Sequence, residues 1–469
     1  MLQTLKNAWK LPDIRKKILF VLFILLIYRI GTVIPVPFVD ASTFNNYFGE
    51  GIFAYLNTLS GGALSTATLF ALGVSPYITA SIVIQLITVA FPKLGEIAKD
   101  GEMGKRKVEM WTRYVTVFLS IVTGFGYYTL LKNNGMLESA AMPQEGSYTW
   151  VLTAFVIVAC YCAGASLVMW LAEKINEKGI GNGISIILFA NIVSSLPSFV
   201  IKLADLIKMA FTPNADNSIA GKAVAISIIL ALVLIIALLA MVVFIIFVTG
   251  SERRIPIQYA KRVVGRKMYG GQNSTLPIKL NMSGVMPIIF ASSIVSLPAT
   301  ILTLCGITSG NGPTNHPHWY SFYEFTSSGS WFYPLMLFIL IIAFSYFYIT
   351  ISFNPVEVSN NLQKNGGAIP GIRQGRPTAQ YISKILSKIT LIGALFLAVI
   401  AILPIAFTPL INWAVSTITG FTDANTLAYY TSSFTFGGTS MLIVVGVALE
   451  TARELEAQLT MRNYKGFLS

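Results

Sequence analysis

The sequence contains few of the residues on which soluble enzymes depend. Of its 469 residues, only 11% are charged, and it has 3 cysteines and 2 histidines. Soluble proteins carry about a quarter charged residues, so this composition excludes a water-soluble fold. Three cysteines cannot form a disulfide scaffold. The histidines, His316 and His318, have no nearby carboxylate or thiol and make a poor metal site.

The usual sequence signatures of catalysis are missing as well. There is no GxxxxGK[ST] phosphate loop, because Gly104-Lys105-Arg106 lacks both the upstream glycine and the hydroxyl. There is no HExxH motif, and no set of serine, histidine and acid can be assembled within the apolar segments. We therefore expect no catalytic residue, no cofactor and no metal in this chain. Any energy that it uses must come from a partner.

Long apolar runs are what the sequence has in abundance. Apolar residues make up 54% of it, and ten runs approach the length of about 20 residues that a membrane-crossing helix needs. They predict an all-α polytopic membrane protein with ten transmembrane helices. The predicted spans are residues 18–36, 74–91, 114–131, 150–171, 183–201, 223–248, 284–304, 332–352, 385–407 and 437–452.

The basic residues orient these spans. If the N-terminus is cytoplasmic and the spans alternate, 28 of the 33 lysines and arginines fall on the cytoplasmic side and four on the other. Cytoplasmic loops carry such an excess, so we expect both termini in the cytoplasm. Loop 251–279 is denser than topology requires, which suits anionic lipid, RNA or an acidic protein, with an ordinary solvated loop as the alternative. Six basic residues crowd into fifteen positions: Arg253, Arg254, Lys261, Arg262, Arg266 and Lys267.

Charge is almost absent from the spans themselves. Arg29 is the only charged residue well inside one, and Glu450 lies near the end of the last. Ion-coupled transporters usually keep ionisable groups at membrane depth, so their absence disfavours a secondary transporter. We expect Arg29 to snorkel to the interface or to bind backbone carbonyls.

Residues 51–73 are apolar but unsuited to a regular span. Glycine, serine and threonine make this segment loose, and Gly73 and Pro76 separate it from the next run. Such a segment is tolerated at membrane depth only where protein buries it or where it lines a cavity. It predicts a short half-helix that fills a cavity, or alternatively an external loop. In the next run, Ile78 and Ile82 share one helix face, a spacing that by itself indicates ordinary packing.

Several short motifs resemble those of the SecY family of protein-conducting channels. They occur in order along almost the whole chain, and together they are far more specific than any one of them. They are YRIG at 28–31 with IPVP at 34–37, LSGGAL at 59–64, PYITASIVIQ at 76–85, GIGNGIS at 179–185, PIIFASS at 287–293, PGIR at 370–373 and FGGTS at 436–440.

The resemblance implies two pseudosymmetric halves around a central pore. The first half is residues 1–202 (spans one to five) and the second is residues 203–469 (spans six to ten). The family moves unfolded preproteins across the membrane or releases apolar segments into lipid between the second and seventh spans. It implies a plug at about 58–72, within which we single out Leu59, Ser60, Gly61, Gly62, Ala63, Leu64, Ser65 and Thr66. It implies a pore ring of Ile78, Ile82, Ile184, Leu188, Ile289 and Ile443, where Leu188 departs from the usual isoleucine.

The resemblance also implies partners and a location. Loops 251–279 and 355–384 would dock the SecA motor and the ribosome, including its RNA, through the six basic residues above and through Arg373 and Arg376. Many relatives have proline after this arginine, so Gln374 predicts a more flexible tip. SecE and SecG subunits, signal-bearing preproteins and membrane lipids are the other expected partners, in the bacterial cytoplasmic membrane. A membrane scaffold that docks ribosomes without conducting protein is a second alternative to the channel, and segment 306–331 has no interpretable match.

Overall fold

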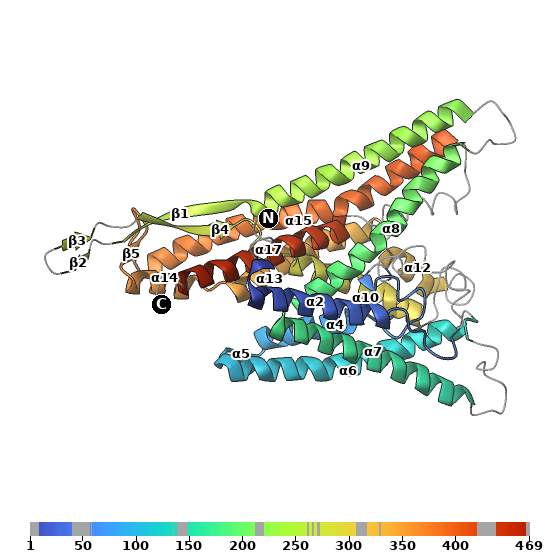
Figure 1. The fold of residues 1–469 in the computed structure, drawn as a ribbon, viewed down its shortest axis with the longest axis horizontal. Coiled ribbons are helices and arrows are strands. Elements are labelled where there is room, and N and C mark those ends of the chain that lie inside the picture. The colour runs from blue at the N-terminus through green and yellow to red at the C-terminus, as the bar shows by residue number, and fades with distance from the viewer. Residues whose placement is uncertain are drawn as a thin grey trace.

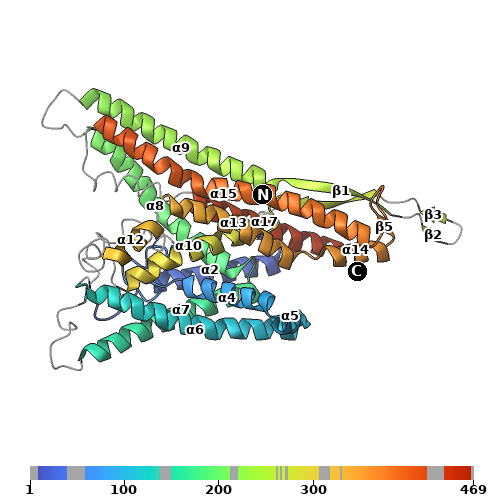
Figure 2. The same cartoon turned by 180° about the vertical axis from the view of Figure 1, so that it is seen from behind.

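The computed structural model describes most of the chain as helices. The described residues are 9–39, 57, 59–133, 135–137, 149–211, 220–259, 262–264, 267–269, 273–305, 317–327, 330–419 and 438–465. The helices form one elongated body, and a narrow β-hairpin projects from one of its ends (Figure 1). The short helix α12 (Pro317–Thr326) lies at the opposite end, as the view from behind also shows (Figure 2).

The described residues of the first part of the chain include six long or well-defined helices. They are α2 (Pro12–Gly31), α4 (Ser75–Ala90), α5 (Pro92–Lys99), α6 (Gly101–Asn133), α7 (Thr149–Lys178) and α8 (Gly183–Phe211). Proline stands in the first turn of α2, α4 and α5, where its missing N–H costs no hydrogen bond. Phe91 is extended and Pro92 follows it, so α4 and α5 meet at a sharp bend of 113°.

The second part adds long helices around the first. They are α9 (Ala220–Gly250), α10 (Met286–Leu304), α13 (Phe332–Ser352), α14 (Pro355–Lys364), α15 (Arg376–Thr419) and α17 (Gly438–Lys465). Helix α10 packs against α4 and α6 of the first part, and α9 and α17 pack against α8. The two parts of the chain therefore meet around α10 and around α8.

The two loops that the charge distribution predicts to be cytoplasmic, 251–279 and 355–384, contribute strands to one small sheet. Strands β1 (Glu252–Tyr259) and β4 (Asn273–Lys279) pair antiparallel, with Glu252 opposite Lys279. The short strand β5 (Gly367–Ala368) adds to the free edge of β1, with Gln258 opposite Ala368. The hairpin of β2 (Arg262–Val264) and β3 (Lys267–Tyr269) forms the tip (Figure 1). Loop 251–279, predicted only as a basic loop, is thus a β-hairpin tied to the second loop.

Each of the ten predicted spans lies largely in one helix. Four helices are long and apolar enough to cross a membrane within the described residues, namely Gly101–Asn133, Trp150–Lys178, Phe332–Lys364 and Arg376–Ile405. The bent pair of Ser75–Ala90 and Pro92–Ala98 can make a fifth, and three shorter apolar helices are Gly183–Pro197, Ile235–Gly250 and Met286–Leu302. The ten-span topology is consistent with these helices and stays a prediction.

Candidate functional site

The six expected ring residues meet in the largest hydrophobic cluster. Helix α4 contributes Ile78 and Ile82, α8 contributes Ile184 and Leu188, α10 contributes Ile289 and α17 contributes Ile443. Five of the six side chains are at most 4% exposed, and Ile184 is partly buried against them. Residues up to 365 positions apart in sequence are therefore brought together, and solvent hardly reaches five of them in this conformation.

Local sequence fixes how α8 presents its two ring residues. The Asn182 side chain caps the helix, because its Oδ1 accepts hydrogen bonds from the backbone N–H groups of Ile184 (3.1 Å) and Ser185 (3.4 Å). Gly181 just before it has φ +82°, which favours glycine. With the helix start set in this way, Ile184 and Leu188 lie one turn apart on one face.

The expected plug segment, residues 59–66, is compact. Of the expected half-helix, residues 51–56 and 58 lie outside the described residues, residues 57 and 59 are helical, and the helix does not continue beyond Leu59. Residues 60–67 form successive turns. Its own polar groups hold these turns: Ser60 Oγ accepts from the Leu64 N–H (3.1 Å), and Asn57 Oδ1 accepts from the Ser65 N–H (3.0 Å). Glycines at 61 and 62 adopt φ +69° and +88°, which interrupts regular helix. Of the eight plug residues, Leu59, Ser60, Ala63 and Leu64 are buried, Gly61, Gly62 and Ser65 are intermediate, and Thr66 is exposed.

The far end of this segment is anchored on the chain that follows α2. Pro35 and Thr68 form an isolated antiparallel bridge. The Val36 N–H donates to the Ala67 carbonyl (3.2 Å), and the Leu69 N–H donates to the Ile34 carbonyl (2.9 Å). The IPVP motif thus provides the backbone partner of the turn segment.

Helix side chains also bind the plug segment, and most of them were missed from the sequence. Arg29 Nη1 donates to the Gly61 carbonyl (3.1 Å), which confirms the expectation that this arginine binds a backbone carbonyl. Asn191 Nδ2 donates to the Leu59 carbonyl (2.6 Å), and the Tyr127 hydroxyl donates to the Leu64 carbonyl (2.7 Å). The sequence signal for Asn191 was an amide within an apolar span, but nothing in the sequence names its acceptor.

The expected docking residues lie at the hairpin end of the molecule. Arg253 and Arg254 are exposed on β1, and Arg254 pairs with Glu252 at 2.7 Å. Arg262 and Lys267 lie on the tip strands β2 and β3. Lys261 and Arg266 lie outside the described residues.

The second expected docking loop, residues 355–384, contains α14, β5 and the start of α15, and side-chain hydrogen bonds hold the turn around Arg373. Arg373 and Arg376 are exposed, the latter at the start of α15. The Thr378 hydroxyl donates to the Arg373 carbonyl (2.8 Å), and Gln374 Nε2 donates to the Gly367 carbonyl (3.2 Å). The expected flexibility at Gln374 is therefore opposed by a hydrogen bond to β5.

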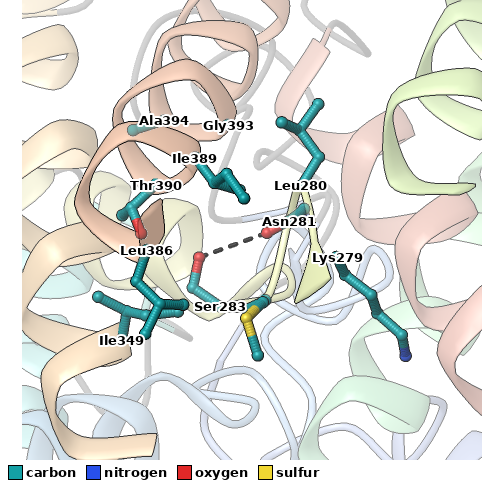
Figure 3. Close-up of a pocket in the computed structure, with 11 residues that line it drawn as sticks. Lys279, Leu280, Asn281, Ser283, Ile349, Leu386, Ile389, Thr390, Gly393 and Ala394 are labelled. Carbon is teal, nitrogen blue, oxygen red and sulfur yellow. Dashed lines mark hydrogen bonds between the residues drawn. The ribbon is translucent and has the colours of Figure 1, made fainter. Parts of the chain in front are cut away.

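A small cavity beside the start of α10 offers no alternative site. It has room for about one water, about 10 Å³. Figure 3 shows Ser283 Oγ donating to Asn281 Oδ1 (3.3 Å) at this cavity, opposite Ile389 and Thr390 of α15. Within the part of the chain that the structure describes, no group of three His, Cys, Asp or Glu residues could hold a metal ion.

Known proteins match this arrangement over nearly the whole chain. The SecY family model matches residues 68–452. The protein translocase subunit SecY of Streptomyces scabiei is 40% identical over 479 residues, with 100% of both chains covered. A solved structure described as a protein conducting channel covers 94% of this chain and 91% of its own at 16% identity, with a TM-score of 0.59. Canine Sec61 in a ribosome-channel complex covers the same shares at 17% identity, with a TM-score of 0.57. This chain therefore belongs to the SecY family.

Proposed function

We propose that this chain forms the protein-conducting channel of a translocase and is not itself an enzyme. It would pass unfolded preproteins across the bacterial cytoplasmic membrane and release apolar segments sideways into the bilayer. The observation that carries this proposal is the gathering of six aliphatic side chains from four helices, five of them buried and Ile184 partly buried, in one cluster that also contains Leu59 of the plug segment. The full-length similarity to named translocase subunits supports it.

The aliphatic side chains of the proposed ring suit a channel through which polypeptides of any sequence can pass. A narrow constriction of aliphatic groups stops ions because water leaves it. Aliphatic groups form no directional bonds with a passing polypeptide, so no particular side chain is held there. Ile78, Ile82, Ile184 and Leu188 belong to the proposed half 1–202, and Ile289 and Ile443 belong to the half 203–469. Separation of the halves would therefore widen the ring.

The seam between α4 and α10 is the proposed route into lipid. These helices correspond to the second and seventh spans, and they pack directly against each other. Both helices contribute buried aliphatic side chains, Ile82 of α4 and Ile289 of α10 among them, to the same hydrophobic cluster. Apolar contacts of this kind can be exchanged at little cost for contacts with an apolar segment of a substrate.

The exposed basic loops are the proposed docking sites for a motor and for the ribosome. A guanidinium group suits both carboxylates of an acidic motor surface and phosphates of ribosomal RNA. The sheet that joins β1 to β5 ties the loop of Arg253 and Arg254 to the loop that carries Arg373. We propose SecA and the ribosome as partners here, SecE and SecG as companion subunits, and both termini on this cytoplasmic side, where positive charge accumulates.

Vesicle reconstitution tests the proposal. The chain, with its own cysteines replaced, is combined with SecE, SecG, SecA and ATP, and a radiolabelled preprotein is scored for protection from protease. A crosslinker on Ile82→Cys reports whether the substrate passes the ring, and the lipid-facing Ile339→Cys, 51% exposed on α13, is the matched control. Protection with a crosslink at 82 and none at 339 is expected.

The other outcomes separate the alternatives. Protection without a crosslink at 82 would retain the channel and move its path away from the ring. No protection, with a SecA that is active on a reference channel, would refute the channel and favour a transporter or a scaffold.

A further inference from the structure

Three backbone carbonyls of the plug segment each accept a hydrogen bond from a side chain of a different helix. Asn191 of α8 binds the Leu59 carbonyl at 2.6 Å. Arg29 of α2 binds the Gly61 carbonyl at 3.1 Å, and Tyr127 of α6 binds the Leu64 carbonyl at 2.7 Å. Within six residues, the segment is thus held from three directions.

We propose that Asn191, Arg29 and Tyr127 form a latch that holds the plug segment against the ring and sets how often the channel opens at rest. They are positioning residues, since they act through the plug and touch no substrate. The inference rests on the proposed channel function and on residues 59–66 being its plug, and the experiment below separates these claims.

The surroundings show that the latch is built rather than incidental. Asn191 is 1% exposed, and its Nδ2 also donates to the Tyr28 hydroxyl at 2.9 Å, so both amide hydrogens have acceptors. Ser194 Oγ donates to the Asn191 carbonyl at 2.7 Å and accepts from Arg29 at 3.3 Å. A buried amide without partners would lose the hydrogen bonds that water provides. The plug carbonyls are therefore part of what stabilises these helices in the observed arrangement.

Gly61 allows the plug backbone to approach α8. Its φ is +69°, and a Cβ at this position would lie 2.9 Å from Asn191 Oδ1 and 3.2 Å from Ser194 Oγ. Most side chains are strained at such a φ, and this space is already occupied. The neighbouring Gly62 has φ +88° but nothing within 4 Å of its Cβ position. The close approach therefore occurs at the residue whose carbonyl Arg29 binds.

Two consequences follow from the nature of the bonds. The acceptors are main-chain carbonyls, so the latch does not depend on the side chains of the plug, and these can change without breaking it. All three donors lie in the proposed half 1–202. Movement of the other half therefore leaves the latch in place, and its release is a separate step.

Removal of single hydroxyl groups tests the latch. Tyr127→Phe deletes one latch donor and little else. Tyr128→Phe and Tyr161→Phe are matched controls, because their buried hydroxyls have no hydrogen-bond partner in the described structure. The readout is the resting open probability of the channel, with SecE and SecG, in planar bilayers without substrate. One buried hydrogen bond corresponds to about a five- to tenfold change, so Tyr127→Phe should raise open probability about that much. Both controls should stay near the wild-type value.

A variant of the second latch donor, Asn191, extends the test, and a deletion within the plug segment, described below, completes it. Asn191→Leu should raise open probability at least as much, and with Tyr127→Phe the factors should multiply to about 25-fold or more if the bonds act independently. Thermal unfolding is measured in parallel. A change in open probability counts only where the unfolding midpoint of the variant is no lower than that of Tyr128→Phe. A variant that unfolds earlier is replaced by Ser194→Ala, which removes the acceptor that orients Arg29.

The outcomes distinguish the latch from the plug. If Tyr127→Phe and Ser194→Ala both behave as Tyr128→Phe does while deletion of residues 60–66 raises open probability, the latch is refuted and the plug stands. If the deletion itself leaves open probability unchanged, the plug assignment fails and the latch fails with it. A rise in Tyr127→Phe matched by the two control tyrosines would show a packing effect and would also overturn the latch.

Discussion

Replacement of Ile289 by asparagine should make the channel leak ions, and the structure gives the size of the effect. In the structure this side chain is 3% exposed and packs in the cluster that contains the proposed ring residues. Burial of an isoleucine contributes about 1.5–3 kcal/mol, and an asparagine in its place would leave its amide without partners at a cost of about 1–3 kcal/mol. In the open conformation both side chains face water, so neither contribution applies there.

The sum weakens the closed state relative to the open one. Values from the lower half of each range, one for the lost isoleucine burial and one for the unpaired amide, add to about 3 kcal/mol. Each 1.4 kcal/mol or so is a factor of ten, so the open fraction should rise about 100-fold. Ile82→Asn on α4, also 3% exposed, should have a similar effect. Both variants should also accept preproteins with defective signal sequences, because less binding energy is then needed to open the ring.

Conductance in planar bilayers measures the leak, and Ile341→Asn is the matched control. Ile341 lies on α13, is 0% exposed and belongs to the same hydrophobic cluster, but it is not a ring residue. Its replacement should lower the thermal unfolding midpoint without raising conductance. Wild-type conductance in a folded Ile289→Asn channel would refute the ring, and equal leaks in Ile289→Asn and Ile341→Asn would show that the leak reports general damage.

Three further predictions concern the docking loop and the plug. Arg373→Glu should impair SecA-driven protection of a preprotein without lowering thermal stability, because this side chain is exposed. Lys364→Glu makes the same change of charge in the same loop and should transport normally. Equal loss of transport in both variants would contradict a specific role for Arg373. Ser359→Ala removes a buried hydroxyl that donates to the Gly375 carbonyl at 2.7 Å, and it should lower the free energy of unfolding by about 1 kcal/mol, measured by denaturant titration. Gly61→Ala and Gly62→Ala both introduce a backbone strain of about 1–2 kcal/mol, but only the new Cβ at position 61 meets Asn191. Gly61→Ala should therefore raise ion conductance more than Gly62→Ala does. Equal conductance in the two variants would contradict the close approach of Gly61 to α8.

Apolar patterning predicted the helices well and their ends less well. Spans 74–91 and 332–352 match α4 and α13 to within a residue. Helix α2 begins at Pro12 rather than 18, and α15 begins at Arg376 rather than 385. The extra turns are polar and extend beyond the apolar run, so a search for apolar residues cannot detect them. Proline at the start of α2 is the local signal that marks its true beginning.

Motifs of the family suggested the six proposed ring residues, which the structure places in one hydrophobic cluster, whereas the contacts of the proposed plug could not be predicted. Arg29 could be assigned a carbonyl partner because a charge in an apolar run needs one. Tyr127 and Asn191 lie 63 and 132 positions from their acceptors, and those acceptors are backbone carbonyls that every residue has. The expected helix does not continue through residues 60–67 for a related reason, since the side chains of Ser60 and Asn57 accept hydrogen bonds from the N–H groups of Leu64 and Ser65 and stabilise turns there.

The proposed ring and the proposed plug are held by different kinds of interaction, and this would separate two steps of opening. The ring draws side chains from both proposed halves, so its apolar contacts weaken gradually as the halves part. The latch lies within one half and consists of hydrogen bonds, which are lost abruptly with distance and angle. Movement of the halves alone would therefore leave a widened ring with the plug still in place. An entering chain would have to displace the plug from Asn191, Arg29 and Tyr127, so that ions meet a closed path until the polypeptide itself fills the pore.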